Sequence, residues 1–171
     1  FIYRKYDLLN FDYIPQDELF SKQWSHLNVK INLNKPTKIF CKFHIPRLEK
    51  NNFRNHKKYG GGCFQDMSPY ASYLINIFLN NKKYLLSCKK KINKIGIVEN
   101  FKLSAKSKNI FLEASFSFNS SYKNEIVIYN KSKIYFLNYA FSPPINRSLK
   151  LEIFDEIEKK RYKINYIKQN V

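Results

Sequence analysis

The sequence predicts an α+β fold in which one amphipathic helix packs on a small, mainly antiparallel β-sheet. Between Ser68 and Asn80, the apolar residues Ala71, Leu74 and Phe78 recur at three- and four-residue spacing, which is typical of a helix with one apolar face. The residues after this helix form a basic succession of short, alternating segments that favour strands. A hydrophobic content of 44% and an aromatic content of 17% indicate a folded chain rather than a disordered one.

The ends of the predicted helix are marked by residues suited to them. Ser68 can cap the first turn with its hydroxyl, and Pro69 suits that turn because the missing N–H has no intrahelical partner there. Asn80 and Asn81 favour a turn, so the helix is predicted to end before them.

Residues 1–66 are predicted to be an N-terminal extension whose composition differs from that of the residues after it. Apart from a short helical turn at Gln16–Phe20, strands are predicted at Val29–Leu33 and Lys38–Phe43. A basic arm at Arg47–Tyr59 leads to Gly60–Gly62, where glycine permits a sharp turn. A boundary near residue 66 would separate this extension from a helix-on-sheet core at 67–138 and a C-terminal β-hairpin region at 139–171.

Seven strand segments are predicted after the helix, because apolar and polar residues alternate in them between turn-forming residues. They are Lys83–Cys88, Gly96–Phe101, Asn109–Phe118, Glu125–Tyr129, Lys133–Leu137, Leu149–Phe154 and Tyr162–Ile167.

The net charge narrows the classes of partner. Lys and Arg number 31 against 13 Asp and Glu, giving a formal charge of +18. Such an excess favours contact with a polyanion: nucleic acid is the first expectation and an anionic membrane surface the second, while a merely solubilising charge stays possible. No apolar run reaches the ~18 residues of a membrane-spanning helix.

Other features bear on the source of the protein. The three cysteines are odd in number and unevenly spaced, which favours a reducing compartment and disfavours a secreted parasite or viral protein. The N-terminus has neither a Met nor a secretory apolar segment, so a trimmed or late-starting chain is expected. Heavy use of Lys, Asn, Ile, Phe and Tyr indicates an A/T-rich genome, as in an organelle.

The order of several short motifs within residues 67–138 resembles universal small-subunit ribosomal protein eight. The opening helix of that family has a capping residue, a proline, an alanine and a Leu/Ile ladder. A basic strand, a glycine-led strand, an apolar strand and a serine–lysine segment follow the helix. The matching residues here are Ser68, Pro69, Ala71, Leu74, Ile77, Lys83–Cys88, Gly96–Phe101, Ile110–Leu112 and Lys131–Phe136.

Several departures from that family are also present. The second helix has almost no room between Cys88 and Gly96, and Asn76 and Phe78 stand where the family tends to have arginines. The Ser-Thr-rich loop with which the family binds ribosomal RNA is not recognisable in residues 139–171.

The resemblance implies a non-catalytic structural protein of an organellar, mitochondrial small ribosomal subunit. Its partners would be ribosomal RNA and neighbouring ribosomal proteins, with no cofactor, no small-molecule substrate and no membrane span. The alternative is an accessory subunit of an organellar respiratory membrane complex. The RNA-binding residues would be Ser68, Lys82, Lys83, Lys89, Lys90, Lys91, Lys106, Lys108, Lys131, Lys133, Tyr135, Arg54, Lys57 and Lys58, with lysines meeting phosphates and tyrosine stacking on bases.

Other chemistry has weaker support in the sequence. Cys41, His44, His56 and Cys63 are four residues of the types that bind zinc, but the spacing of the second pair is unusual. A Cys–His nucleophile built on Cys63 lacks an identifiable orienting group. The glycine triplet lacks the pattern of a phosphate-cradling loop. No metal and no enzyme activity are therefore expected.

Overall fold

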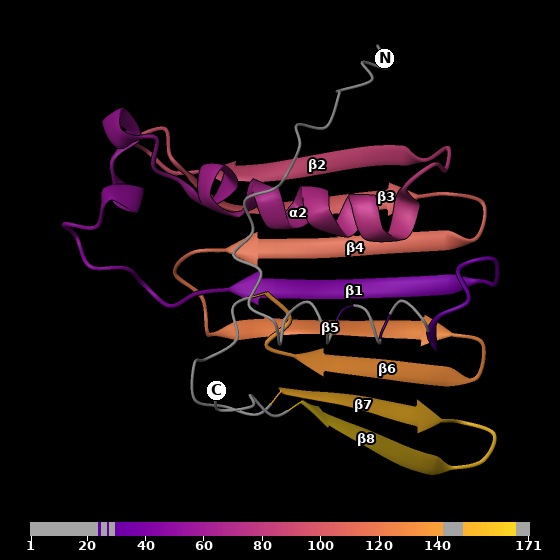
Figure 1. Cartoon of the computed structure of the whole chain (residues 1–171). Coiled ribbons are helices and arrows are strands. Elements are labelled where there is room, and N and C mark those ends of the chain that lie inside the picture. The colour runs from indigo at the N-terminus through magenta and orange to yellow at the C-terminus, as the bar shows by residue number, and fades with distance from the viewer. Residues whose placement is uncertain (1–23, 25–26, 28–29, 142–148, 167–171) are drawn as a thin grey trace, which may run out of the picture.

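A computed structural model describes residues 24, 27, 30–141 and 149–166, and these residues form one eight-stranded mixed sheet with a helix on one face (Figure 1). The strand order across the sheet is β2-β3-β4-β1-β5-β6-β7-β8. The bounds are β1 Thr37–His44, β2 Leu85–Ile92, β3 Val98–Lys106, β4 Ile110–Ser117, β5 Lys123–Asn130, β6 Lys133–Asn138, β7 Leu149–Asp155 and β8 Lys160–Tyr166.

The α+β class and the helix-on-sheet arrangement are confirmed, but the sheet is larger than the small one expected. Among the described residues, every pair of neighbouring strands is antiparallel except β1 and β4. The strand β1 lies between β4 and β5, in the middle of the sheet. The sheet therefore shows no break at residue 66, since a strand from the predicted extension pairs with two strands of the predicted core.

Alternation along β1 gives this strand one buried and one exposed face. Ile39, Cys41 and Phe43 are buried on one face, while Lys38 and Lys42 are exposed on the other. Ile39 is opposite Leu112 of β4 and Ile128 of β5, and all three side chains are fully buried. The buried side chains of β1 therefore continue the apolar rows of β4 and β5 across the middle of the sheet.

The helix α2 runs from Cys63 to Leu79, so the predicted start at Ser68 is wrong. Ser68 and Pro69 lie inside the helix, and Gly62, with φ 131°, is the residue before it. The apolar stripe extends one turn further back than expected, because Cys63 and Met67 are buried together with the predicted Leu74 and Phe78. Burial of this stripe against β3 and β4 outweighs the single backbone hydrogen bond that the proline removes.

Two further predictions differ from the structure. Lys30 is helical and residues 31–36 form a loop and turn, so the described part of Val29–Leu33 is not a strand. The strand β2 continues through Lys89–Lys91 to Ile92 instead of ending at Cys88. It tolerates three lysines because it is an edge strand and all eight of its residues are exposed. The predicted turn at Gln16–Phe20 lies outside the described residues.

The core lies on the face of the sheet that α2 covers (Figure 1). Phe101 of β3 and Phe116 of β4 stack there with ring centroids 4.6 Å apart. Trp24 lies on the same face, because its ring packs against Phe78 of α2 and Phe141, and its indole N–H donates to the Ala140 carbonyl oxygen at 3.0 Å. No helix among the described residues is long and apolar enough to cross a membrane.

Candidate functional site at the amino end of the helix

The connection from β1 to α2 brings a set of polar groups to one end of the sheet. Two short 3-10 helices, Phe53–Asn55 and Lys57–Tyr59, lead into Gly60–Gly62 and the first turn of α2. Gly60 has φ 73°, a left-handed conformation that costs glycine little. A Cβ on Gly61 would lie 2.5 Å from the Arg54 carbonyl oxygen, so the chain can pass this point only as glycine.

An ion pair joins this connection to the helix. Arg54 Nε donates to Asp66 Oδ1 at 2.8 Å, and the two side chains are 32% and 25% exposed. Asp66 lies in the first turn of α2, where a carboxylate also interacts favourably with the helix dipole. The Arg54 guanidinium therefore helps to position the glycine turn, and its charge is already paired with that of Asp66.

Three aromatic side chains, one of them from α2, pack together in what we call the aromatic wall: Phe43, Tyr70 and Phe141. Tyr70 is half-buried and meets both neighbours edge-on, with ring centroids 5.1 Å from Phe43 and 5.2 Å from Phe141. The hydroxyl of Tyr70 makes no hydrogen bond to another described residue. A phenol held in this way can donate to, or accept from, an oxygen of a bound molecule.

A cleft of about 300 Å³ opens at the same end of the sheet. Its lining combines the cations of Arg47 and Lys50 with the carboxylate of Glu99 and several side-chain amides. Residues from the β1–α2 connection, the β2–β3 turn and the end of β4 contribute to it, so it is assembled only by the tertiary fold.

The cysteines and histidines considered as metal ligands do not gather. No cluster of three or more possible metal ligands exists among the described residues. Cys41 is buried in β1, and burial raises the pKa of its thiol well above the ordinary value. His44 lies at the end of β1, where its Nε2 forms a hydrogen bond with the Ser115 hydroxyl at 2.8 Å. Burial lowers the pKa of this imidazole, and the nearby positive charge of Lys42 lowers it further. His56 packs edge-on against Tyr59 instead.

Cys63 is not an activated nucleophile. It is fully buried at the start of α2, with Sγ 3.7 Å from the sulfur of Met67. Burial raises the pKa of its thiol to about 12, so the thiolate needed for nucleophilic attack is scarce at neutral pH.

The lysines predicted to bind RNA are divided between the two ends of the sheet (Figure 1). The turns β3–β4 and β5–β6 and the chain after α2 lie at one end, with Lys82, Lys83, Lys106, Lys108, Lys131 and Lys133. The 3-10 helices with Arg54, Lys57 and Lys58 lie at the other end. Lys89 and Lys91 lie along the edge strand β2, and the ammonium group of Lys90 lies 3.2 Å from the centre of the Phe64 ring.

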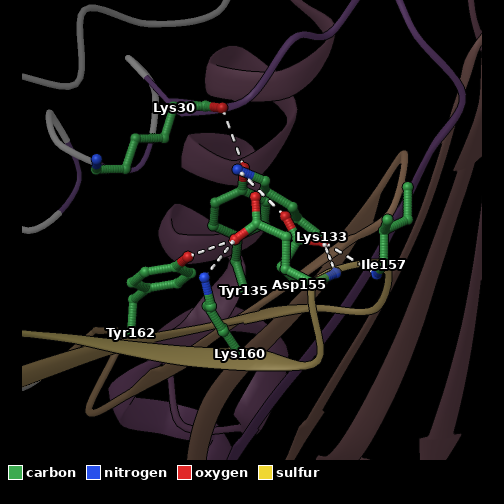
Figure 2. A network of polar contacts seen from close by, with 8 residues as sticks. Lys30, Lys133, Tyr135, Asp155, Ile157, Lys160 and Tyr162 are labelled. Carbon is green, nitrogen blue, oxygen red and sulfur yellow. Dashed lines mark hydrogen bonds and ion pairs between the residues drawn. The ribbon is translucent and has the colours of Figure 1, made fainter.

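Tyr135 and Lys133 belong to a polar network beside the β7–β8 turn (Figure 2). Tyr135 is only 4% exposed, and its hydroxyl donates to the Lys30 carbonyl oxygen at 3.1 Å. Lys133 pairs with Asp155 at 3.6 Å, and the same carboxylate accepts from the Ile157 amide at 3.0 Å. The stacking role predicted for Tyr135 does not fit this burial.

Comparison with known proteins supports a different class of protein from the one expected. No family model matches the sequence, and no curated protein matches it. The crystal structure of KijD10, a 3-ketoreductase from Actinomadura kijaniata in complex with NADP and TDP-benzene, matches with a TM-score of 0.71 at 14% identity. That match covers 87% of this chain and 47% of the other.

Two more solved structures agree with this result. An aldose-aldose oxidoreductase from Caulobacter crescentus, complexed with glycerol, matches with a TM-score of 0.63 at 8% identity, over 90% of this chain and 45% of the other. A dehydrogenase (MviM) from Clostridium difficile matches with a TM-score of 0.61 at 14% identity, over 87% and 44%. All three neighbours are oxidoreductases, and the first is in complex with NADP.

The comparisons overturn the resemblance to the ribosomal protein and what it implied. The neighbours are enzymes, so the non-catalytic role in translation is wrong, as is the respiratory alternative. The neighbours bind small molecules and NADP, which contradicts the predicted ribosomal RNA and ribosomal protein partners and the absence of a small-molecule substrate. The mitochondrial location stays a prediction. The chain spans about half the length of these oxidoreductases and, over that half, has their fold.

Proposed function

We propose that this chain forms the sheet domain of an oxidoreductase that acts on a polyhydroxylated, sugar-like small molecule. The observation that carries the proposal is the fold likeness to NADP-complexed 3-ketoreductase, which extends over 87% of this chain. A neighbour that binds TDP-benzene and another that bears the name aldose-aldose oxidoreductase support the substrate class.

A nicotinamide cofactor does not fit the described residues by themselves. A dinucleotide site needs a glycine-rich turn directly between a strand and a helix, within a parallel βαβ unit. Here the glycines precede α2, but the connection from β1 is long and contains both 3-10 helices. We therefore assign no nucleotide site to the described residues and derive no hydride-transfer step from them.

At the aromatic wall we assign Tyr70 to the substrate, because this ring is half-buried whereas Phe43 and Phe141 are almost fully buried behind it. An accessible aromatic ring packs well against the C–H surfaces of small molecules that carry hydroxyl groups at their edges. The Tyr70 hydroxyl adds a hydrogen-bonding group that can donate to, or accept from, a carbonyl or alcohol oxygen of such a molecule. The charge of +18 favours a substrate that also carries phosphate.

Amide-resolved NMR titration tests this assignment. TDP-glucose, glucose and ADP are each added to the labelled chain, and shifts are followed at residues 43–45 and 60–73. We expect TDP-glucose to shift these residues and Tyr70→Phe to weaken its binding by about 2–10-fold, the effect of one lost hydrogen bond. Tyr129→Phe, which removes an exposed hydroxyl on the opposite face of the sheet, is the matched control and leaves the affinity unchanged.

Three results would contradict the proposal. The first is the absence of a shift at these residues with any of the three compounds at millimolar concentration. The second is binding that maps instead to the cleft beside Arg47, with Tyr70→Phe without effect. The third concerns the cofactor: NADPH added in the same NMR titration and shifting the amides of residues 60–73 at micromolar concentration would mean that the described residues do hold a nucleotide site.

A further inference from the structure

The cleft beside Arg47 is a second concave feature at this end of the sheet, and its lining is separate from the aromatic wall. None of the three side chains of that wall lines it. Its volume of about 300 Å³ is close to the lower limit for sites that bind small molecules. The cleft is therefore suited to one ligand of about the size of a single sugar.

Backbone hydrogen bonds hold the walls of the cleft in place. The Ile45 amide donates to the Ser117 carbonyl oxygen at 2.9 Å, and the Ser120 amide donates to the Ile45 carbonyl oxygen at 3.1 Å. The Phe118 amide donates to the Glu99 carbonyl oxygen at 2.9 Å. These bonds join the chain after β1, the start of β3 and the chain after β4, which all contribute to the lining. The cleft is thus formed by the fold itself.

Two side-chain amides in the lining are each fixed through one polar atom and leave the other available. Asn93 Oδ1 accepts from the backbone amides of Ile95 and Ile97 at 3.1 and 3.0 Å. Asn55 Nδ2 donates to the Glu49 carbonyl oxygen at 2.7 Å. Within the described part of the chain, the Asn93 amino group and the Asn55 side-chain oxygen have no partner. The cleft therefore offers a donor and an acceptor in fixed places, which suits hydroxyl groups because these both donate and accept.

The charged side chains that line the cleft do not neutralise one another. Arg47 and Lys50 are exposed, and neither forms an ion pair with a carboxylate of the described residues. Glu99 is half-buried and also lacks an ion pair there, although it lines the same cleft as the two cations. A ligand with an anionic group at one end and hydroxyl groups at the other would supply partners to all three, through hydrogen bonds strengthened by charge.

The floor of the cleft is apolar. Ile97, Val98 and Phe118 line it and are 5%, 8% and 5% exposed. Such a floor packs against the C–H face of a sugar ring, while the hydroxyl groups of the ring meet polar groups at the rim. The Phe118 ring is too deeply buried to offer a face on which a nucleobase could stack. A sugar therefore fits this floor better than a nucleoside does.

We propose that this cleft binds a phosphorylated sugar. The phosphate lies against Arg47 and Lys50, because guanidinium and ammonium groups are the side-chain cations that bind phosphate. The sugar hydroxyls meet the two available amide groups and the Glu99 carboxylate. This site goes beyond the proposed function, since it is separate from the substrate site at Tyr70 and does not depend on it.

Amide-resolved NMR titration of the full chain tests the proposal. Glucose 6-phosphate, glucose and inorganic phosphate are added separately, each up to about 10 mM, in a buffer that is otherwise free of phosphate and has constant ionic strength. We expect glucose 6-phosphate to shift the amides of residues 47–50, 93–99 and 118–119. Its affinity is expected to be at least about 10-fold higher than that of glucose or of inorganic phosphate, because it contacts both the cations and the hydroxyl-binding groups.

Three variants separate specific contacts from overall charge. Arg47→Gln is expected to weaken the binding of glucose 6-phosphate at least about 5-fold, because it removes a charge-assisted contact with the phosphate. Lys94→Gln is the matched control: it makes the same change of charge at an exposed side chain of the β2–β3 turn that does not line the cleft, and leaves the affinity within about 2-fold. Glu99→Gln is expected to lower the preference for glucose 6-phosphate over inorganic phosphate at least about 3-fold, since only the sugar loses a carboxylate partner.

Circular dichroism first establishes that the variants are folded, and Lys50→Gln replaces Arg47→Gln, with the same expectation, if the latter is not. The absence of shifts at the cleft residues overturns the proposal. So does an equal affinity for inorganic phosphate, which would indicate a simple anion site, or for glucose, which would mean that the phosphate is not recognised. Arg47→Gln without effect, or Lys94→Gln with the same effect, also contradicts it.

Failure of this proposal and failure of the proposed function give different results. Shifts by glucose 6-phosphate that are confined to residues 43–45 and 60–73 would place the ligand at the aromatic wall and overturn only the cleft site. Shifts by glucose 6-phosphate at the cleft that Arg47→Gln weakens would support the cleft site, even if Tyr70→Phe had no effect on the binding of TDP-glucose.

Discussion

Replacing Ile39 by alanine tests whether β1 is an integral strand of the core. Ile39 is fully buried at the centre of the sheet, opposite Leu112 and Ile128, which are also fully buried. Three carbon atoms are lost from a site where strands on both sides prevent collapse. Substitutions of this kind cost about 2–5 kcal/mol, and we expect a value near the middle, about 3.5 kcal/mol.

The effect of Ile39→Ala can be measured by urea unfolding followed by circular dichroism. A loss of about 3.5 kcal/mol should also lower the melting temperature by roughly 7–14 °C for a chain of this size. Leu85→Ala is the matched control, because Leu85 lies on the edge strand β2 with 63% of its surface exposed and should cost under about 0.5 kcal/mol. If the two variants were equally stable, β1 would not be the strand that joins β4 to β5, and the sheet described here would be wrong.

Three other predictions concern the glycine turn, the polar network and the thiols. Gly61→Ala should cost about 2–3 kcal/mol in urea unfolding, because the new Cβ meets a backbone oxygen, whereas Gly60→Ala faces open space and should cost only about 1 kcal/mol for its left-handed backbone. Hydrogen bonds from backbone amides, that of Glu158 having the largest effect, hold the pKa of the Asp155 carboxyl below its ordinary value. The stability contributed by the ionised carboxylate is therefore complete above about pH 4 and is lost as the pH falls further. Asp155→Asn should remove that loss from the pH dependence of the melting temperature. Iodoacetamide at pH 8 should modify one thiol of the folded protein, the exposed Cys88, and mass spectrometry that found Cys63 modified equally fast would contradict the burial described here.

Local patterns in the sequence were enough to locate most of the strands. The alternation of apolar and polar residues predicts β1, β4, β5, β6, β7 and β8 within a few residues of their observed bounds. It also predicted the apolar stripe of α2 from Ala71 to Phe78. These patterns are local, because the side chains of one strand or helix alternate with the period of that element.

The candidate site was only partly accessible to such reasoning. The sequence predicts a turn at the glycine triplet, but it predicts an RNA contact for Arg54, because a sequence does not show that the guanidinium meets Asp66. No local pattern marks Tyr70, since its position depends on contacts with Phe43 and Phe141, which lie far away in the chain. The unusual run of three glycines before an apolar stripe was the available signal that the helix begins earlier than Ser68.

The sequence by itself determined the α+β class, the strand-rich second half and the large positive charge, because each follows from composition or from short-range periodicity. Only the tertiary structure decided that β1 lies between β4 and β5, that the lysines are divided between the ends of the sheet, and that the residues lining the cleft come together. The physical reason is that strand pairing joins residues distant in sequence, and the energy that selects one pairing comes from burial across the whole sheet. The likeness to oxidoreductases followed from that pairing, since at 14% identity the shared property is the path of the backbone.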